Sequence, residues 1–297
     1  MKTAYSVVSE NNFRTIFLMT VFLSLVFGLG YVFSYLLKDR TIFYGFVIFG
    51  VLTNIIAIFW GDKIVLSLSG AKEVKKENFP ELWNLVDNLS IAAGLPKIPK
   101  IYIINSPALN AFATGKSPKN SYVVFTKGIL EKLDKSELEG VAAHEISHIK
   151  NYDIRVMMIA SILAGIIAIM ADMFLHSVFS GGRDRDKNNG LLFIIGLVLS
   201  FLAPIFAQLI TLAISRKREF MADATAALLT RHPEALASAL EKISSSNIPL
   251  DASPATAHLF ISNPFKNKGS IRNWLGNLFS THPPVEERIK VLRNMVF

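Results

Sequence analysis

Cysteine is absent from this chain of 297 residues, and charged side chains make up only 18% of it. Without cysteine no disulfide can form, and a transition metal would have to be bound by histidines and carboxylates. The low charged share accompanies 51% hydrophobic residues and a mean hydropathy of +0.40, both high for a water-soluble domain. We therefore expect much of the chain to lie in a lipid bilayer.

A basic stripe interleaved with aromatic residues, the pattern typical of nucleic-acid binding, is also missing from the sequence. Lysine and arginine total 31 against 23 aspartates and glutamates, a net charge of +8. Such a surplus is common in the cytoplasmic loops of membrane proteins. The sequence predicts the membrane as a partner and no nucleic acid.

Four apolar stretches are long enough to cross a membrane, at residues 15–37, 41–61, 154–179 and 191–215. At 1.5 Å per residue each one spans the hydrocarbon core of about 30 Å. The first is too long for the apolar core of a signal peptide, so we expect an uncleaved anchor. Short polar breaks at 38–40 and 181–190 pair the stretches into two hairpins, within residues 1–61 and 154–215. The prediction is an α-helical integral membrane protein with four transmembrane helices.

Positive charge predicts the orientation of these spans. The two short loops carry five lysines and arginines, whereas more of them, including Lys63, Lys150 and Arg216, lie near the span ends on the other side. Because lysine and arginine concentrate on the inner face of membranes, residues 62–153 and 216–297 should be cytoplasmic.

The segment between the hairpins should form a small, mainly α-helical α+β domain. Residues 80–93 have helical periodicity and end at Gly94, while 100–104, 111–114 and 122–125 are short β-branched or aromatic runs typical of strands. Ser136 followed by Glu139 indicates a capping box, which would open a helix that runs through His148.

That helix contains the sequence His144-Glu145-Ile146-Ser147-His148. Residues four apart share one helical face, so both imidazoles can bind a single zinc ion. Glu145 is rotated about 100° from His144, which suits a general base acting on a zinc-activated water. A solvated helix with two unrelated histidines is the alternative interpretation.

A third zinc ligand must come from elsewhere in the chain. The metzincin pattern would require glycine and histidine at Asn151 and Ile154, so that class is excluded. Glu219 and Asp223 share a helical face just after the fourth span; such a pair alone is more typical of a solvated surface. An antiparallel pair of spans would, however, bring Glu219 beside His148. We therefore predict one zinc per chain, held by both histidines and Glu219, with Asp223 orienting a ligand histidine.

These motifs, together with Asn110-Ala111-Phe112-Ala113-Thr114-Gly115 and Thr281-His282-Pro283-Pro284 followed by Arg288, resemble the HtpX family of bacterial membrane-bound heat-shock metallopeptidases, which is related to the eukaryotic CAAX prenyl proteases. The resemblance covers nearly the whole chain. It implies a zincin-like metalloendopeptidase of the bacterial inner membrane that faces the cytoplasm. Its expected substrates are unfolded, misfolded or damaged membrane proteins, and other quality-control proteases are expected partners.

The resemblance also assigns roles that the residues alone leave open. It implies that Asn110, with Ala111, Phe112 and Ala113, lines the substrate strand, and that His282 and Arg288 stabilise the transition state or the substrate carbonyls. From the sequence alone, His282 could instead cap a turn before two prolines. Arg288 could pair with Glu286, Glu287 or a lipid headgroup.

Two other functions fit parts of the sequence. A membrane transporter or scaffold with a structural zinc would have a closed coordination sphere and no use for Glu145. A prenyl-protein protease would share the zinc site but enclose it in an intramembrane chamber, for which four spans are few.

Overall fold

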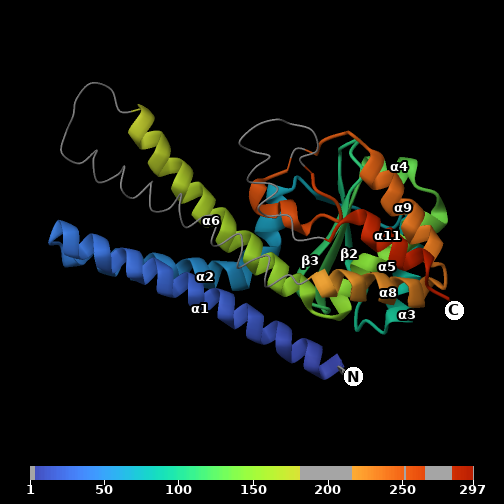
Figure 1. Cartoon of the computed structure of the whole chain (residues 1–297), viewed down its shortest axis with the longest axis horizontal. Helices are drawn as coiled ribbons and strands as arrows, with labels where there is room; N and C mark the ends of the chain where they lie inside the picture. Colours follow the sequence, from blue (N-terminus) through green and yellow to red (C-terminus); the bar gives the residue numbers. More distant parts are fainter. Residues whose placement is uncertain (1–3, 181–215, 251, 265–282, 297) are drawn as a thin grey trace.

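Two long apolar helices form an antiparallel hairpin at the start of the chain (Figure 1). The structure is a computed structural model that describes residues 4–180, 216–250, 252–264 and 283–296. Helix α1 is Ala4–Leu37 and α2 is Arg40–Leu68, and Asp39 begins α2 by accepting a hydrogen bond from the Thr41 backbone N–H at 2.8 Å. The segments Ser9–Leu37 and Arg40–Leu68 are long and apolar enough to cross a membrane. The first predicted hairpin is present, and its second helix runs seven residues past the expected end at residue 61.

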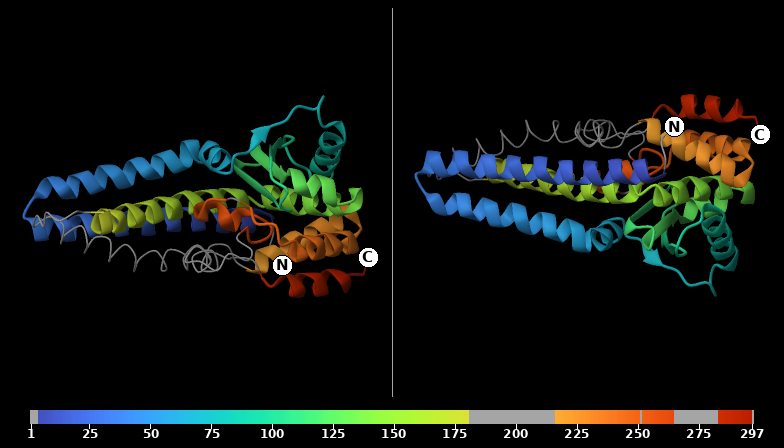
Figure 2. Two further views of the ribbon diagram at one scale, coloured as in Figure 1. Left: turned by 90° about the horizontal axis from the view of Figure 1, so that it is seen from above. Right: turned by 90° about the horizontal axis from the view of Figure 1, so that it is seen from below.

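The third predicted span forms helix α6, Asp153–Ser180, which lies along the hairpin (Figure 2). Apolar side chains from the three helices pack in one core, among them Phe22 of α1, Ala57 of α2 and Met158 of α6. Among the described residues only α1 and α2 have the length and hydropathy of a membrane span. The fourth predicted span, 191–215, lies outside the described residues.

A four-stranded sheet lies at one end of these helices (Figure 1). Its strands are β1 Lys72–Glu73, β2 Lys100–Ile104, β3 Ala111–Ser117 and β4 Asn120–Thr126, in the order β1-β2-β4-β3. Strands β2 and β4 are parallel, and the other two pairs are antiparallel. Since β4 lies between β2 and β3, β3 is left as an edge strand of this sheet. The sequence predicted β2 to the residue, the first four residues of β3 and the centre of β4, but not the short β1.

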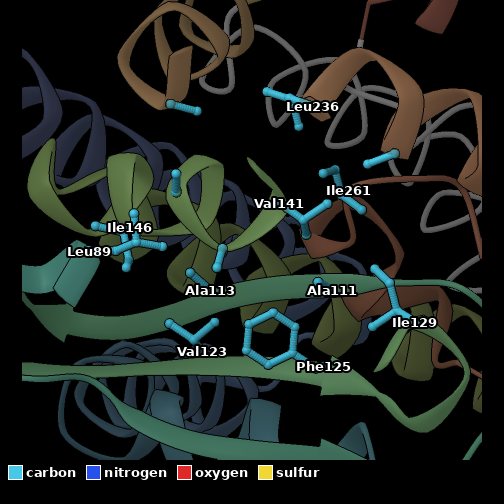
Figure 3. Packing of buried hydrophobic residues seen from close by; sticks show 14 of the residues in the cluster. Leu89, Ala111, Ala113, Val123, Phe125, Ile129, Val141, Ile146, Leu236 and Ile261 are labelled. Atoms are coloured by element: carbon cyan, nitrogen blue, oxygen red, sulfur yellow. The ribbon is translucent and has the colours of Figure 1, made fainter. Parts of the chain in front are cut away.

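Helices cover one face of the sheet. A second hydrophobic core, separate from that of the three long helices, fills the space between the sheet and the helices that cover it (Figure 3). Val123 and Phe125 of β4 point toward Val141 and Ile146 of the central helix, beyond which lies Leu236. All five side chains are at most 1% exposed. The helices of this part are α3 Pro80–Ala93, α4 Lys127–Lys132, α5 Lys135–Lys150, α8 Arg216–Thr230, α9 Pro233–Ser245, the 3-10 helix η1 Pro254–Leu259 and α11 Val285–Arg293. The predicted α+β domain is thus built from segments on both sides of α6.

Helix α5, which carries the histidine motif, has its N-cap two residues earlier than the predicted Ser136. Asp134 is the N-cap: its carboxylate accepts from the Glu137 backbone N–H, and the Glu137 carboxylate accepts from the Asp134 N–H, both at 2.9 Å. Ser136 only donates its hydroxyl to Asp134. The prediction of a Ser136–Glu139 capping box was wrong because Asp134, two residues upstream, forms the same reciprocal pair with Glu137.

Gly140 lets the middle of α5 approach α9 closely. A Cβ atom at this position would lie 3.0 Å from the backbone N and Cα of Leu236. The Glu137 carboxylate, one turn earlier, accepts hydrogen bonds from Ser238 at 2.6 Å and Lys242 at 2.7 Å. The two helices are therefore joined by both a close backbone contact and a partly buried ion pair.

Candidate metal centre

Helices α5 and α8 bring three potential metal ligands together. His144 and His148 project from one face of α5, and Glu219 faces them from the first turn of α8. The two Nε2 atoms are 3.2 Å apart, and the Glu219 oxygens lie 3.7 Å from Nε2 of His144 and 3.6 Å from that of His148. All three residues are buried. The predicted ligand set therefore converges, although Glu219 follows His144 by 75 residues in the sequence.

These separations match what a tetrahedral metal ion requires. Ligand atoms about 2.0–2.1 Å from an ion at tetrahedral angles are about 3.3 Å from one another. The observed 3.2–3.7 Å is close to that value. Two imidazole nitrogens and a carboxylate are also a donor set that suits zinc and related divalent ions. The side chains present can hold one such ion with little movement.

The second ring nitrogen of His144 is held from the C-terminal part of the chain. Nδ1 lies 2.9 Å from the carboxylate of Asp223, which is itself bound by both Nε and Nη2 of Arg288 at 2.8 and 2.7 Å. Burial disfavours the charged carboxylate, but the charge and hydrogen bonds of Arg288 outweigh this and lower the pKa of Asp223 to about 2. Burial, helped by Arg288, also lowers the pKa of His144 to about 4. His144 is thus a neutral imidazole, the form that binds a metal ion.

The second ring nitrogen of His148 is held by another carboxylate. Its Nδ1 lies 3.1 Å from Asp153, the first residue of α6. Burial opposes a charge on this ring, but the bond to Asp153 and the nearby carboxylates, Glu219 foremost, raise the pKa of His148 to about 9. Metal binding at neutral pH must therefore displace a proton from His148.

Glu145 is the predicted general base, and it is buried in the same helix between the two histidines. Its negative charge contributes to raising the pKa values of His148 and Arg288. Glu145 directly follows the ligand His144 on α5, and its catalytic role stays a prediction.

Arg288 points inward, and the three partners considered for it from the sequence alone were wrong. Its side chain is 0% exposed and bound to Asp223, whereas Glu286 and Glu287 are exposed on α11. The amphipathic helix α11 turns Arg288 toward α8, which excludes a lipid headgroup. Its Nη1 atom lies 3.6 Å from Glu219 and has no hydrogen-bond partner among the residues described here. His282 lies outside the described residues.

The predicted substrate strand is in place, but its start is already bonded to the chain itself. The Asn110 side chain donates to the Ser262 carbonyl at 2.8 Å and accepts from the Ser262 N–H at 3.3 Å. The Ile261 N–H donates to the Ala111 carbonyl at 3.0 Å. Phe112 packs edge-on against Phe260, with ring centroids 4.8 Å apart. Whether Asn110, Ala111, Phe112 and Ala113 contact substrate stays a prediction.

Sequence reasoning missed Asp153 and the two residues that contact its other oxygen, Asn11 and Arg218. Asp153 had been placed at a domain boundary, immediately before the third span. Asn151 was a usable signal, because asparagine often ends a helix and a break there would let Asp153 turn back toward His148. Asn11 gave no comparable signal.

The chain is similar to known proteins over most of its length. Peptidase family M48 matches residues 76–296. The protease HtpX homolog of Dictyoglomus thermophilum is 51% identical over 256 residues, covering 83% of this chain and 82% of that protein. The protease HtpX homolog of Dictyoglomus turgidum is 48% identical over 296 residues, covering 99% and 95%. The crystal structure of S. mikatae Ste24p superposes with a TM-score of 0.49 at 19% identity, over 97% of this chain and 67% of that one.

The M48 match begins after the apolar hairpin and includes both histidines of α5, Glu219 and Arg288. It therefore covers the whole ligand cluster and the residues that support it from the C-terminal side. The relatives extend the similarity through the hairpin to almost the full length of the chain. The chain belongs to peptidase family M48, whose members are metalloproteases.

Proposed function

We propose that this protein is a membrane-bound zinc metalloendopeptidase of the gluzincin type, with zinc bound by His144, His148 and Glu219. One observation carries the proposal: the three ligand side chains converge at tetrahedral spacing immediately beside a buried glutamate. Among the described residues this is the group of histidines and carboxylates that could hold a metal ion, and it offers three ligands. Three protein ligands are typical of a catalytic zinc, whereas a structural zinc has four.

Glu145 is the residue that moves protons in this proposal. Zinc, when bound, supplies a Lewis acid for the attacking water and for the scissile carbonyl. The Glu145 carboxylate accepts a proton from the water as it attacks and then delivers it to the leaving amine nitrogen. The proposal is supported by the position of Glu145, which is buried and directly follows the ligand His144 on α5.

Arg288 would support the negative charge that develops on the carbonyl oxygen. Its guanidinium is fixed by two hydrogen bonds to Asp223, which leaves Nη1 on the Glu219 side of the centre. A buried, preorganised cation beside the reacting carbonyl stabilises the transition state more than a mobile one does. His282, just before the two prolines that precede α11, is proposed for the same task on the strength of its motif.

Strand β3 would hold the substrate in an extended conformation. The Asn110 carbonyl accepts from the Thr126 N–H of β4, so residue 110 faces β4 and, by the alternation of an antiparallel pair, Ala111 and Ala113 face away from it. The Ala111 carbonyl is used by Ile261. Ala113 is therefore the position at which a peptide backbone can add to the edge. Binding through backbone groups suits a protease for unfolded segments of varied sequence.

We further propose that the chain spans the bacterial inner membrane four times, with residues 1–61 and 154–215 as hairpins. Residues 62–153 and 216–297 would then form the cytoplasmic peptidase and meet at the metal centre. Misfolded or damaged membrane proteins are the proposed substrates, with other quality-control proteases as partners. The relatives called protease HtpX homolog and the two apolar helices support this assignment.

The orientation can be tested by single-cysteine labelling, because the native chain has no cysteine. A Lys119→Cys variant, at the exposed turn between β3 and β4, should react only from the cytoplasmic side. An Asn188→Cys variant should react only from outside. Labelling of both from one side would refute the crossing of the second hairpin.

The catalytic assignment is tested by Glu145→Gln, which keeps the shape of the side chain and removes the base. Cleavage of an unfolded protein by the purified variant should fall by about 10²- to 10⁴-fold, while zinc content stays near one per chain. Glu139→Gln on the same helix is the matched control and should cleave like the wild type. Comparable cleavage by Glu145→Gln would refute the mechanism, and an unchanged zinc content in Glu219→Ala would refute the ligand set.

A further inference from the structure

Asp153 reaches His148 only because the chain breaks between the two residues. On a continuous α-helix, a residue five positions later is rotated about 140° away and cannot contact the earlier side chain. Here α5 ends at Lys150, Tyr152 adopts a left-handed backbone with φ of 62°, and α6 begins at Asp153. A left-handed conformation is unfavourable for a tyrosine. The turn therefore includes an unfavourable backbone conformation, and it directs the Asp153 carboxylate back to the His148 ring.

The second oxygen of Asp153 is held by residues from both ends of the chain. Asn11 of α1 donates to Oδ1 at 2.9 Å and also to the Asn151 carbonyl at 2.6 Å. Arg218 of α8, next to the ligand Glu219, pairs with the same oxygen. Asn11 is 1% exposed, so its hydrogen bond to Asp153 is buried, at the polar start of the long apolar helix α1.

We propose that Asp153 is the positioning residue of His148 and that Asn11 fixes Asp153, so that the first apolar helix takes part in building the metal centre. The inference rests on the metal role of His148 proposed above. A carboxylate that accepts the Nδ1–H fixes the tautomer with its lone pair on Nε2, which is the nitrogen that faces His144 and Glu219. Asn11, in turn, restricts the carboxylate to one orientation by occupying the oxygen that His148 does not use.

The test measures zinc affinity by competition with a chelator, using the full-length protein in membrane mimetics. Asp153→Asn should bind zinc about 10- to 100-fold more weakly, as is usual when the outer partner of a ligand histidine is lost. Asn11→Ala should lose less zinc affinity than Asp153→Asn, up to about tenfold. Asn12→Ala is the matched control, because Asn12 is the exposed neighbour on α1 and accepts a hydrogen bond from Arg155. It should bind zinc like the wild type.

A charge-swapped double variant, Asn11→Asp with Asp153→Asn, separates positioning from simple attachment of α1 to α6. The swap keeps an amide–carboxylate pair between the helices but moves the carboxylate away from His148. We expect its thermal stability to recover toward that of the wild type while its zinc affinity stays low.

Three results would overturn the inference: wild-type zinc affinity in Asp153→Asn, recovery of zinc affinity in the swap, or equal affinity in Asn11→Ala and Asn12→Ala. Failure of the proposed function is a different result. His148→Ala that still binds zinc as tightly as the wild type would refute the metal site itself, whatever the Asp153 variants do.

Discussion

The two histidines of the centre are supported by opposite ends of the chain and in different ways. His144 is held by Asp223 and Arg288, a fully buried charge pair from two adjacent C-terminal helices. His148 is held by Asp153, whose other contacts are a neutral amide from the first apolar helix and an arginine that is 11% exposed. The first support is compact and strongly charged, whereas the second is assembled from three distant segments. The comparison teaches that one metal site can depend on the C-terminal helices through one ligand and on the first apolar helix through the other.

The largest effect should follow from breaking the C-terminal support at its cation. Arg288→Met leaves Asp223 buried without its charge partner, which typically costs about 3–5 kcal/mol in the free energy of unfolding. Denaturation of the purified variant in detergent would measure this loss. Arg293 lies on the same helix as Arg288 and forms exposed ion pairs with Glu234 and Glu241 of α9. The control variant Arg293→Met removes these pairs and should unfold like the wild type. Similar stability of Arg288→Met and Arg293→Met would contradict the structural weight given to the buried pair.

A milder change on the same side concerns the carboxylate itself. Asp223→Asn keeps the volume of the side chain but weakens its bonds to His144 and Arg288, so zinc affinity should fall by about 10- to 100-fold. Chelator competition under the conditions used for Asp153→Asn would show whether the two supports contribute equally. An Asp223→Asn variant with wild-type affinity would mean that Arg288 and packing alone orient the ring.

The smallest effect lies at the far end of α5, away from both supports. The carboxylate of Glu137 is buried, and its hydrogen bonds to Lys242, Ser238 and the Asp134 N–H outweigh the cost of burial and lower its pKa. Lys242→Met should therefore destabilise the protein by about 1 kcal/mol, discounted because Lys242 is 45% exposed, without changing zinc affinity.

The sign of the pH dependence distinguishes this ion pair from a packing effect. A carboxyl group whose pKa is lowered by folding contributes stability above its unfolded pKa, near 4.3, and loses that contribution as pH falls through the lower folded value. The difference between wild type and Lys242→Met should thus be full at pH 6 and shrink as the solution is acidified below about pH 4. A difference that is constant down to pH 3 would assign the effect to the methylene packing of Lys242.

The sequence predicted the parts of the molecule that depend on local pattern. Helical spacing put His144 and His148 on one face, and uncharged length marked the two N-terminal helices, both as observed. Glu219 does meet the two histidines. The hairpin from which that convergence was predicted includes residues 191–215, which lie outside the described residues, so this step of the argument stays a prediction. The inferences that succeeded are those that a short-range rule decides.

Contacts between distant segments could not be predicted in this way. Neither the Asn11–Asp153 bond nor the direction of Arg288 follows from periodicity, because the first depends on how α1 packs against α6 and the second on how α11 packs against α8. Asp134 replaced Ser136 as the helix cap because both residues have capping side chains, and the choice between them is made by the preceding turn. The sequence therefore indicates which residues are chemically capable, while packing decides which of them meet.

The close approach of α5 and α9 at Gly140 has a consequence for how this protein can vary. Most positions in a core accept several apolar side chains of similar volume, since neighbouring side chains can repack. At position 140 the obstacle is the Leu236 main chain, which cannot rotate away as a side chain can. A Cβ atom at position 140 would require α9 to move by a few tenths of an ångström, so a saturation library at this codon should be enriched in glycine. The next residue, Val141, should tolerate isoleucine or leucine. The choice of residue one turn before the histidine motif is thus restricted by the separation of two helices and not by the chemistry of the site.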